Sequence, residues 1–146
     1  MLRKVSLFLV LLMACSLLAG CNGPIRGKVT DSSTEAAIAD ASVFLLKKDI
    51  DWEPGYVLDK IASLDLDTIA LDADVLAFIN DQLADISLDA QTTTDAEGKF
   101  LFEDKDGSAF YGVLVFKQGY RLDFAMTTID FMGLGLTSRT ISLAPR

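Results

Sequence analysis

The sequence contains no histidine, and this absence excludes several chemistries at once. Ser-His-Asp and Cys-His couples need an imidazole, and so do metal sites with imidazole ligands and the commonest general base near neutral pH. Basic residues are also few, because 13 Lys and Arg stand against 21 Asp and Glu in 146 residues. A nucleic-acid partner requires a basic surface, so the composition predicts no nucleic-acid binding. The length is typical of one domain with its own core.

The sequence has only two cysteines, Cys15 and Cys21, both near its beginning. Residues 1–20 are typical of a cleaved signal peptide, because two basic residues precede an almost entirely apolar run, residues 5–18. That run is shorter than the stretch of about 20 residues that a membrane-spanning helix needs. Cys21 would then be the single cysteine of the mature chain, so no internal disulfide is expected.

Residues 18–21, with the letters LAGC, resemble the lipobox of bacterial lipoproteins. The resemblance implies that the Cys21 thiol receives a diacylglycerol, that cleavage separates Gly20 from Cys21, and that the new amino group is acylated. Such a transfer needs a nucleophilic thiolate, and several acyl chains would anchor the protein permanently. Asn22 stands where an Asp commonly retains such lipoproteins in the inner membrane, which favours the outer membrane. Residues 21–24 are expected to be the lipidated terminus and its tether.

From residue 25 onward the sequence reads as short strands around an acidic middle. Residues 25–30 alternate between apolar or small and polar side chains, the period of a half-buried strand. The other expected strands are residues 41–46, 91–94, 99–102, 111–116, 121–128 and 137–143. Turns rich in Gly and Asp separate them, a pattern typical of an all-β sandwich.

The acidic middle differs in composition from its flanks. Residues 49–89 hold eleven acidic residues and one base, whereas the flanks after residue 20 hold ten of each sign. Such a shift marks an insertion or a separate substructure. A helical wheel of residues 71–86 gathers six apolar side chains on one face, which favours a helix, and a shorter helix is expected at residues 57–64. The six are Leu71, Val75, Phe78, Ile79, Leu83 and Ile86. An extended structure is the alternative, because two short runs alternate strictly between apolar residues and Asp.

Four short motifs follow one another along the flanks. They are residues 25–31 (IRGKVTD), 38–43 (IADASV), 94–100 (TDAEGKF) and 117–120 (KQGY). The series resembles the carboxypeptidase regulatory-like domain, a transthyretin-like β-sandwich of about seven strands. Its most specific element is Thr-Asp-x-x-Gly-x-Phe, which the family places at a hairpin, and Asp40 stands where the family usually has Gly.

The resemblance covers residues 25–48 and 91–143, and it makes residues 49–90 a long insertion in a domain of residues 25–146. We therefore expect a mainly β fold, an antiparallel sandwich with an acidic, partly helical insertion. The motif residues have structural explanations, because Asp95 can accept bonds from backbone N–H groups and Gly98 and Gly119 suit tight turns.

Enzymes related to this fold do not match the sequence. Metallocarboxypeptidases carry such a module beside a zinc domain that needs His ligands. Transthyretin-related hydroxyisourate hydrolases use His and Arg and end in Tyr-Arg-Gly-Ser, whereas residues 143–146 are Leu-Ala-Pro-Arg. Carboxylate-pair chemistry is compatible with the composition, but clustered acids are usually solvated. We expect no catalytic residue and no cofactor apart from the covalent lipid on Cys21.

Calcium is the metal that the acidic middle would suit best. Asp65, Asp67, Asp72 and Asp74 offer hard oxygen ligands close together in the sequence. However, the sequence has no Asp-x-Asp-x-Asp-Gly loop, and a helix over residues 71–86 would turn two of these carboxylates apart. No metal site is therefore predicted.

The expected function is a non-catalytic envelope lipoprotein that binds or scaffolds a protein partner through its acidic insertion. Burial of Phe78 and Ile79 would leave only the acids facing outward and would require a basic partner. The alternative is a carbohydrate-binding accessory module, with Trp52 and Tyr56 as speculative ligand contacts, although both aromatics could instead pack the insertion onto the sandwich. A purely structural envelope protein is the third hypothesis.

Overall fold

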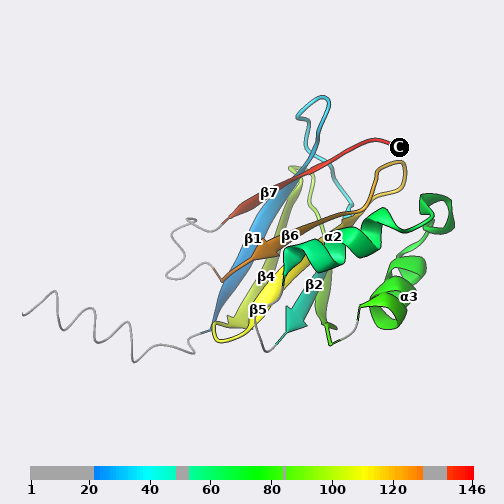
Figure 1. Cartoon of the computed structure of the whole chain (residues 1–146). Helices are drawn as coiled ribbons and strands as arrows, with labels where there is room; N and C mark the ends of the chain where they lie inside the picture. Colours follow the sequence, from blue (N-terminus) through cyan, green and yellow to red (C-terminus); the bar gives the residue numbers. More distant parts are fainter. Residues whose placement is uncertain (1–21, 49–52, 84, 130–137) are drawn as a thin grey trace, which may run out of the picture.

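The computed structural model describes residues 22–48, 53–83, 85–129 and 138–146 (Figure 1). Its elements are, in order, β1 (Asn22–Asp31), β2 (Ser42–Lys48), α2 (Pro54–Ala62), the 3-10 helix η1 (Leu66–Thr68), α3 (Asp72–Gln82), β3 (Ser87–Thr93), β4 (Lys99–Asp106), β5 (Phe110–Phe116), β6 (Asp123–Thr127) and β7 (Arg139–Leu143). The seven described strands form two sheets, of order β4–β1–β7 and β3–β2–β5–β6. A buried apolar cluster fills the space between them. The predicted mainly β sandwich of about seven strands is confirmed.

β1 lies in the middle of the three-stranded sheet, antiparallel to β4 and parallel to β7. The other ladders between described strands are antiparallel. Ile25 and Val29 are fully buried between the sheets, while Arg26 and Lys28 alternate with them along the strand and are only partly buried. The predicted alternation is therefore confirmed for residues 25–29, because one face of this sheet meets the core and the other meets solvent. It is wrong for Thr30, which was expected on the polar side and is only 8% exposed.

The four-stranded sheet is covered on both faces. Val43 and Leu45 of β2 join the cluster between the sheets, whereas Phe44 and Leu46 join a second cluster formed with α2 and α3. β5 divides its side chains between the two clusters in the same way. Covering on both faces explains why β2 and β5 are continuous apolar runs rather than alternating ones.

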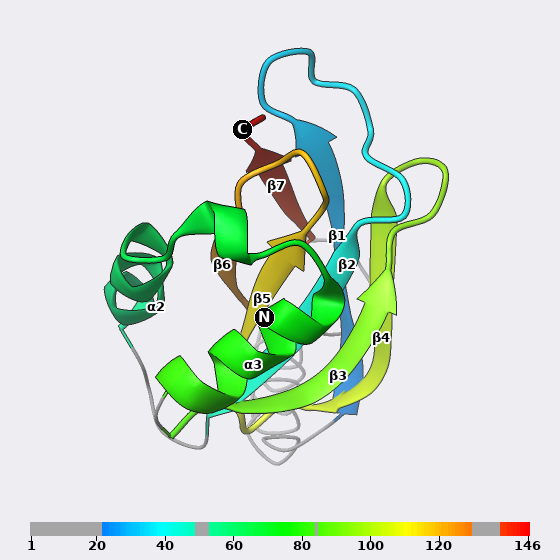
Figure 2. The same cartoon turned by 90° about the vertical axis from the view of Figure 1, so that its right-hand side faces the viewer.

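Residues 53–83, here called the helical layer, lie against the outer face of the four-stranded sheet, as Figure 2 shows. Val57 of α2 is fully buried against the sheet, and Phe78 and Ile79 of α3 keep only 4% and 1% of their surface exposed. The helices expected at residues 57–64 and 71–86 are thus confirmed with shifted bounds. Among the described residues, no helix combines the length and the apolar composition that crossing a membrane requires.

Leu71 was expected on the buried face of the second helix, and this expectation is wrong. Leu71 is the N-cap residue of α3, with φ −132° and ψ 159°, and its side chain is 66% exposed. Because the Leu71 backbone is extended and not helical, the direction of its side chain does not follow the helical spacing of residues 72–82.

The hairpin that the resemblance implies at the Thr-Asp-x-x-Gly-x-Phe element, between the expected strands of residues 91–94 and 99–102, is also wrong. β3 pairs with β2, and β4 pairs with β1, so the turn between them carries the chain from one sheet to the other. The Thr94 hydroxyl accepts a hydrogen bond from the Ala41 N–H at 2.9 Å, which fixes the end of β3 beside β2. The Gly98 carbonyl accepts a hydrogen bond from the Val29 N–H at 2.8 Å, which fixes the start of β4 beside β1.

Candidate functional site

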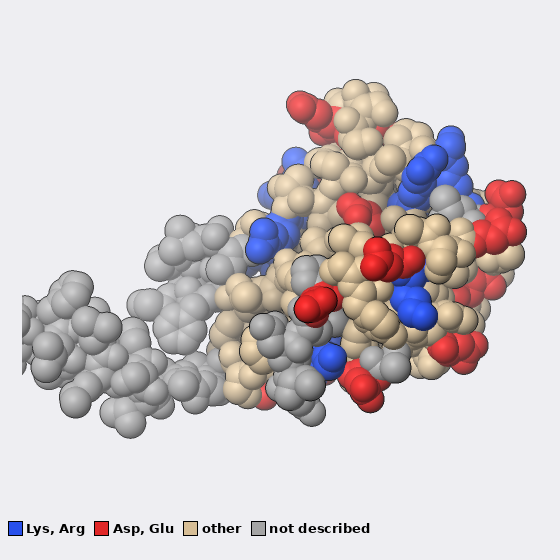
Figure 3. All heavy atoms as spheres, viewed as in Figure 1, with Lys and Arg blue, Asp and Glu red and all other residues tan. Residues whose placement is uncertain are grey.

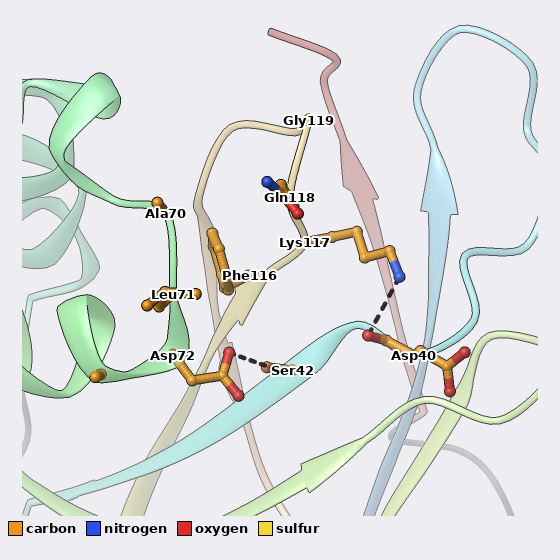
Figure 4. Close-up of a pocket in the computed structure, with 10 residues that line it drawn as sticks. Asp40, Ser42, Ala70, Leu71, Asp72, Phe116, Lys117, Gln118 and Gly119 are labelled. Carbon is orange, nitrogen blue, oxygen red and sulfur yellow. Dashed lines mark hydrogen bonds between the residues drawn. The ribbon is translucent and has the colours of Figure 1, made fainter.

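An open groove of about 760 Å³ lies at the end of the sandwich where β2 begins, β5 ends and α3 begins (Figure 4). Asp40 and Ser42, residues 70–73 and residues 116–119 line it. Apart from Asp72, which was weighed as a calcium ligand, the sequence does not indicate these residues as a site, because the segments are far apart in the sequence and each is only a strand end or a helix start. The one other local signal is Asp40, an acidic residue where the resemblance to the carboxypeptidase regulatory-like domain implies Gly.

Asp40 lines the rim of the groove with a left-handed backbone. Its φ is +55°, in the left-handed region that Asp tolerates better than most residues. The carbonyl of Asp40 accepts a hydrogen bond from Lys117 Nζ at 3.4 Å across the groove (Figure 4). Asp40 therefore places an acidic residue at the rim of the groove, with a backbone conformation that glycine adopts more easily.

Asp72 connects α3 to the four-stranded sheet. Its Oδ1 accepts a hydrogen bond from Ser42 Oγ at 2.7 Å, and its Oδ2 accepts one from Gln91 Nε2 at 3.3 Å. Ser42 is 7% exposed and its hydroxyl donates to a carboxylate, with no imidazole in the chain to accept a proton from it. The Ser42–Asp72 pair is thus a structural link between β2 and α3.

The start of α3 is held by its own third residue. Asp74 Oδ2 accepts hydrogen bonds from the Ala70 N–H at 2.9 Å and the Leu71 N–H at 2.8 Å. The Ala70 bond, followed by the Leu71 bond, lowers the pKa of Asp74 below 3.8. The two hydrogen bonds to the Asp74 carboxylate hold the Leu71 backbone in place beside the groove.

The carboxylates considered for calcium do not converge. Asp72 bonds Ser42 and Gln91, while Asp74 bonds the backbone ahead of α3. Asp65 accepts a hydrogen bond from the Asp67 N–H at 3.1 Å, and both side chains are exposed. Within the part of the chain that the structure describes, no group of three or more His, Cys, Asp or Glu could hold a metal ion.

Most acidic side chains of the helical layer and of the residues that follow it point to solvent. Figure 3 shows acidic side chains along the edge of the molecule that α3 occupies. The exposed acids are Glu53, Asp59, Asp65, Asp67, Asp81 and Asp85, and Asp72 and Asp74 are half-buried. The Asp89 side chain is 24% exposed and pairs with Lys105 at 2.9 Å. Because the apolar side of the helices is used in packing, this layer presents mainly negative charge.

The remaining predicted site residues are only partly described. Tyr56 is 38% exposed, its hydroxyl donates to the Gln82 carbonyl at 3.2 Å, and Lys60 Nζ lies 5.8 Å from the centre of its ring. The hydrogen bond connects α2 to α3, whereas the Lys60 contact lies within α2, so the sugar-stacking and packing roles of Tyr56 both stay predictions. Trp52, Gly20 and Cys21 lie outside the described residues, so their roles stay predictions.

The residues of the Thr-Asp-x-x-Gly-x-Phe element have structural roles. Asp95 Oδ1 accepts hydrogen bonds from the Glu97 and Lys99 N–H groups, both at 2.9 Å. Gly98 has φ +75°, and the Phe100 ring is buried between the sheets. The expected turn chemistry of Asp95 and Gly98 is confirmed, although the turn joins two sheets instead of closing a hairpin.

The first and last motifs meet through one hydrogen bond. The Tyr120 hydroxyl donates to Asp31 Oδ2 at 2.9 Å. The Ser33 N–H and then the Tyr120 hydroxyl lower the pKa of Asp31 below 3.8, and the same bond raises the pKa of Tyr120 above 10.0. A carboxyl with a lowered folded-state pKa stabilises the protein above its unfolded pKa and loses this effect as the pH falls through its folded pKa.

We therefore expect Tyr120→Phe to lower the melting temperature at neutral pH and to lower it less as the pH falls below 3.8. The measurement is thermal unfolding between pH 2 and pH 7. Tyr56→Phe is the matched control, because the Tyr56 hydroxyl bonds a carbonyl that does not titrate. An equal effect of Tyr120→Phe at both ends of this pH range would contradict the prediction.

Comparisons with known proteins identify no family. No protein-family model matches the sequence, and no curated protein matches it. The fold is similar to that of the shaft pilin SpaA from Lactobacillus rhamnosus GG, with 15% identity and a TM-score of 0.49 over 86% of this chain and 46% of the pilin. It is also similar to a Pseudomonas aeruginosa protein proposed to bind carbohydrate, with 14% identity and a TM-score of 0.46 over 86% of this chain and 90% of that protein.

An enzyme is among the similar structures as well. The 3-chlorocatechol 1,2-dioxygenase of Rhodococcus opacus 1CP has 14% identity and a TM-score of 0.47 over 87% of this chain and 61% of the enzyme. The chain therefore spans less than two thirds of the pilin and of the dioxygenase. With a pilin, a binding protein and an enzyme at nearly equal similarity, these likenesses assign no function.

Proposed function

We propose that this chain is a lipid-anchored, non-catalytic module of the bacterial cell envelope that binds a basic protein partner on its helical layer. One observation carries the proposal. Phe78 and Ile79 are 4% and 1% exposed, so the apolar side of α3 is used on the sheet and the outward side is acidic. A surface of this kind attracts positive charge and repels acidic partners.

The groove supports the same proposal, because it adds an apolar contact to the acidic surface. Leu71 is 66% exposed on the wall of the groove. In the sequence it follows Ala70 and directly precedes Asp72, and Asp74 comes two residues later. A partner segment could place an apolar side chain over Leu71 and basic side chains near the acids of the helical layer. Apolar contact would supply affinity and charge would supply selectivity.

The chemistry of the groove supports binding over catalysis. Ser42 and Asp72 bond each other, the sequence has no histidine, and no group of metal-ligating side chains was found among the described residues. The alternative, a carbohydrate-binding module, depends on exposed aromatic faces. Tyr56 is the described candidate, and Lys60 lies over its ring.

The location is proposed from the sequence. A lipid on Cys21 would hold the protein at the membrane, and Asn22 favours the outer membrane through the resemblance to bacterial lipoproteins. In this proposal the sandwich is a rigid support that presents the helical layer to an envelope protein.

Crosslinking in intact cells tests the proposal. We expect the double variant Asp67→Lys, Asp81→Lys to reduce crosslinking to the partner about tenfold, because two exposed acids become like charges facing a basic surface. Leu71→Glu should weaken capture by removing the apolar contact. Glu103→Lys is the matched control, an exposed acid on β4 far from the helical layer, and it should leave capture unchanged.

Four other results would contradict parts of the proposal. Equal crosslinking by all four proteins would place the partner elsewhere. Retention on envelope polysaccharide, lost in Tyr56→Ala, would support the carbohydrate-binding alternative. No saturable partner would leave a structural role, and Cys21→Ala protein that stays in the membrane fraction would contradict lipid anchoring.

A further inference from the structure

We infer that the end of the sandwich where β1 begins contacts the bilayer directly, with Phe110 at the headgroup boundary, so that the groove faces away from the membrane. This inference rests on the lipidation of Cys21 proposed above. The deciding observation is how close the lipidated residue is to the first strand.

The chain leaves almost no room for a tether. β1 begins at Asn22, the residue directly after Cys21, and adjacent Cα atoms are about 3.8 Å apart. Asn22 already pairs with Asp106 of β4, and Gly23 pairs with Lys105. Residues 22–24, expected in the tether, are therefore part of the sheet. Acyl chains on Cys21 would hold this end of β1 within about one residue of the lipid headgroups.

The strand registers show which other residues share this end. β4 ends at Asp106, opposite Asn22, and β5 begins at Phe110 after the turn that follows β4. Phe110 pairs with Lys48, the last residue of β2. The beginnings of β1 and β5 therefore lie at one end of the sandwich, as Figure 1 also shows.

The side chains at this end suit contact with a lipid surface. Phe110 is 40% exposed, and Lys48 is its cross-strand neighbour on the same face of the sheet. An aromatic ring beside a lysine is favoured at headgroup level, where the ring meets acyl carbon and the ammonium meets phosphate. The nearby acids are partly engaged, because Asp89 pairs with Lys105 at 2.9 Å and Asp106 accepts hydrogen bonds from Ser108.

The groove lies at the opposite end. β5 runs from Phe110 to Phe116, which lines the groove, and seven strand residues span about 20 Å. Ser42, at the start of β2, also lines the groove, whereas Lys48, at the end of the same strand, pairs with Phe110. A partner would thus approach the groove from the aqueous side, with the bilayer behind the sandwich.

Depth-dependent quenching tests this orientation on the full lipidated protein. Trp52, the single tryptophan, is replaced by Phe, and one reporter is introduced as Phe110→Trp or, at the groove, as Leu71→Trp. The proteins are reconstituted in phosphatidylethanolamine–phosphatidylglycerol vesicles with brominated acyl chains. We expect about a twofold loss of fluorescence for Phe110→Trp and none for Leu71→Trp.

Flotation of the vesicles tests the lipid anchoring separately from the orientation of the sandwich. Protein that floats while Phe110→Trp is not quenched would overturn the orientation and leave lipid anchoring intact. Quenching of Leu71→Trp alone would reverse the orientation. Protein that does not float would overturn the lipid anchoring and the orientation with it. Unfolding curves of both variants should match that of the Trp52→Phe parent, because both reporter sites are exposed.

Discussion

A chain in which residues 49–86 are replaced by a Gly/Ser linker of about four residues should aggregate or fail to fold. The linker itself is not the obstacle, because Lys47 and Ser87 are paired neighbours in β2 and β3 and a short loop can join them. The measurement is the yield of soluble monomer by gel filtration, with circular dichroism of any soluble fraction.

The reason is the face of the sheet that the helical layer covers. Without it, large apolar side chains of β2, β5 and β6 would face water on one side of the four-stranded sheet. They are Phe44, Leu46, Leu114, Phe116 and Phe124. Each such side chain contributes roughly 1.5–3 kcal/mol when fully buried. Their sum is comparable with the total stability of a small domain, about 5–15 kcal/mol.

A single substitution tests the packing of α3 on the four-stranded sheet without removing the helical layer. Phe78→Ala should lower the free energy of unfolding by about 3–5 kcal/mol, because it leaves a cavity between α3 and the sheet. Asn80→Ala is the matched control, an exposed residue of the same helix with an expected effect within about 0.5 kcal/mol. A soluble, cooperatively folded deletion protein, or a Phe78→Ala variant as stable as the wild type, would contradict this role.

The helical layer is therefore a third layer of the fold and not a removable attachment. A partner that is lost with the whole layer would report unfolding as much as lost contact. Substitutions of exposed residues, such as Asp67→Lys and Leu71→Glu, are the changes that separate binding from folding.

Glycine substitutions should also have large effects, and the chain contains a matched set of four. Gly98 combines φ +75° with a backbone neighbour, since a Cβ would lie 2.5 Å from the Val29 carbonyl oxygen. Gly27 lies outside the left-handed region, but a Cβ there would lie 2.5 Å from a backbone oxygen of β7. Gly119 has φ +87° and open space, and Gly55 has neither constraint.

These constraints predict an order of stability for the four alanine variants. A left-handed backbone costs an L-residue about 1–2 kcal/mol, and a clash in a packed site costs about 1–3 kcal/mol. Gly98→Ala should therefore lose about 2–5 kcal/mol, Gly27→Ala about 1–3 kcal/mol and Gly119→Ala about 1–2 kcal/mol. Gly55→Ala, within α2, should be stabilised by about 0.4–1 kcal/mol.

Urea unfolding of residues 22–146 gives these four free energies directly. The informative comparison is between Gly98→Ala and Gly119→Ala, because both have positive φ and only the first has a close backbone neighbour. Equal losses in these two variants would show that the Val29 contact relaxes and that conformation alone accounts for the cost.

Much of the secondary structure could be predicted because burial leaves a local period in the sequence. Residues 25–29 alternate because β1 has one buried and one solvent face. Val75, Phe78 and Ile79 follow helical spacing because α3 packs one side on the sheet. The burial predicted for Leu71 was wrong, because the helix starts after it and helical spacing applies only to residues with helical backbone.

The neighbours of each strand could not be predicted in the same way. Residues 94–100 carry the signal of a tight turn, and Asp95 and Gly98 do form one. Whether such a turn closes a hairpin or changes sheets depends on what holds its two ends. Here the answer comes from Ala41 and Val29, which bond Thr94 and Gly98 from distant parts of the chain.

The sequence by itself determined most strand and helix segments, the acidic character of residues 49–89 and the chemistry of the turns, because each depends on neighbours along the chain. It did not determine the start of β3, which begins at Ser87, inside the insertion predicted over residues 49–90. Only the tertiary structure decided that β1 lies parallel to β7, that the helices complete the core, and that Asp40, Leu71 and Lys117 share one groove. Contacts of this kind join residues far apart in the sequence, and such contacts leave no periodic trace in it.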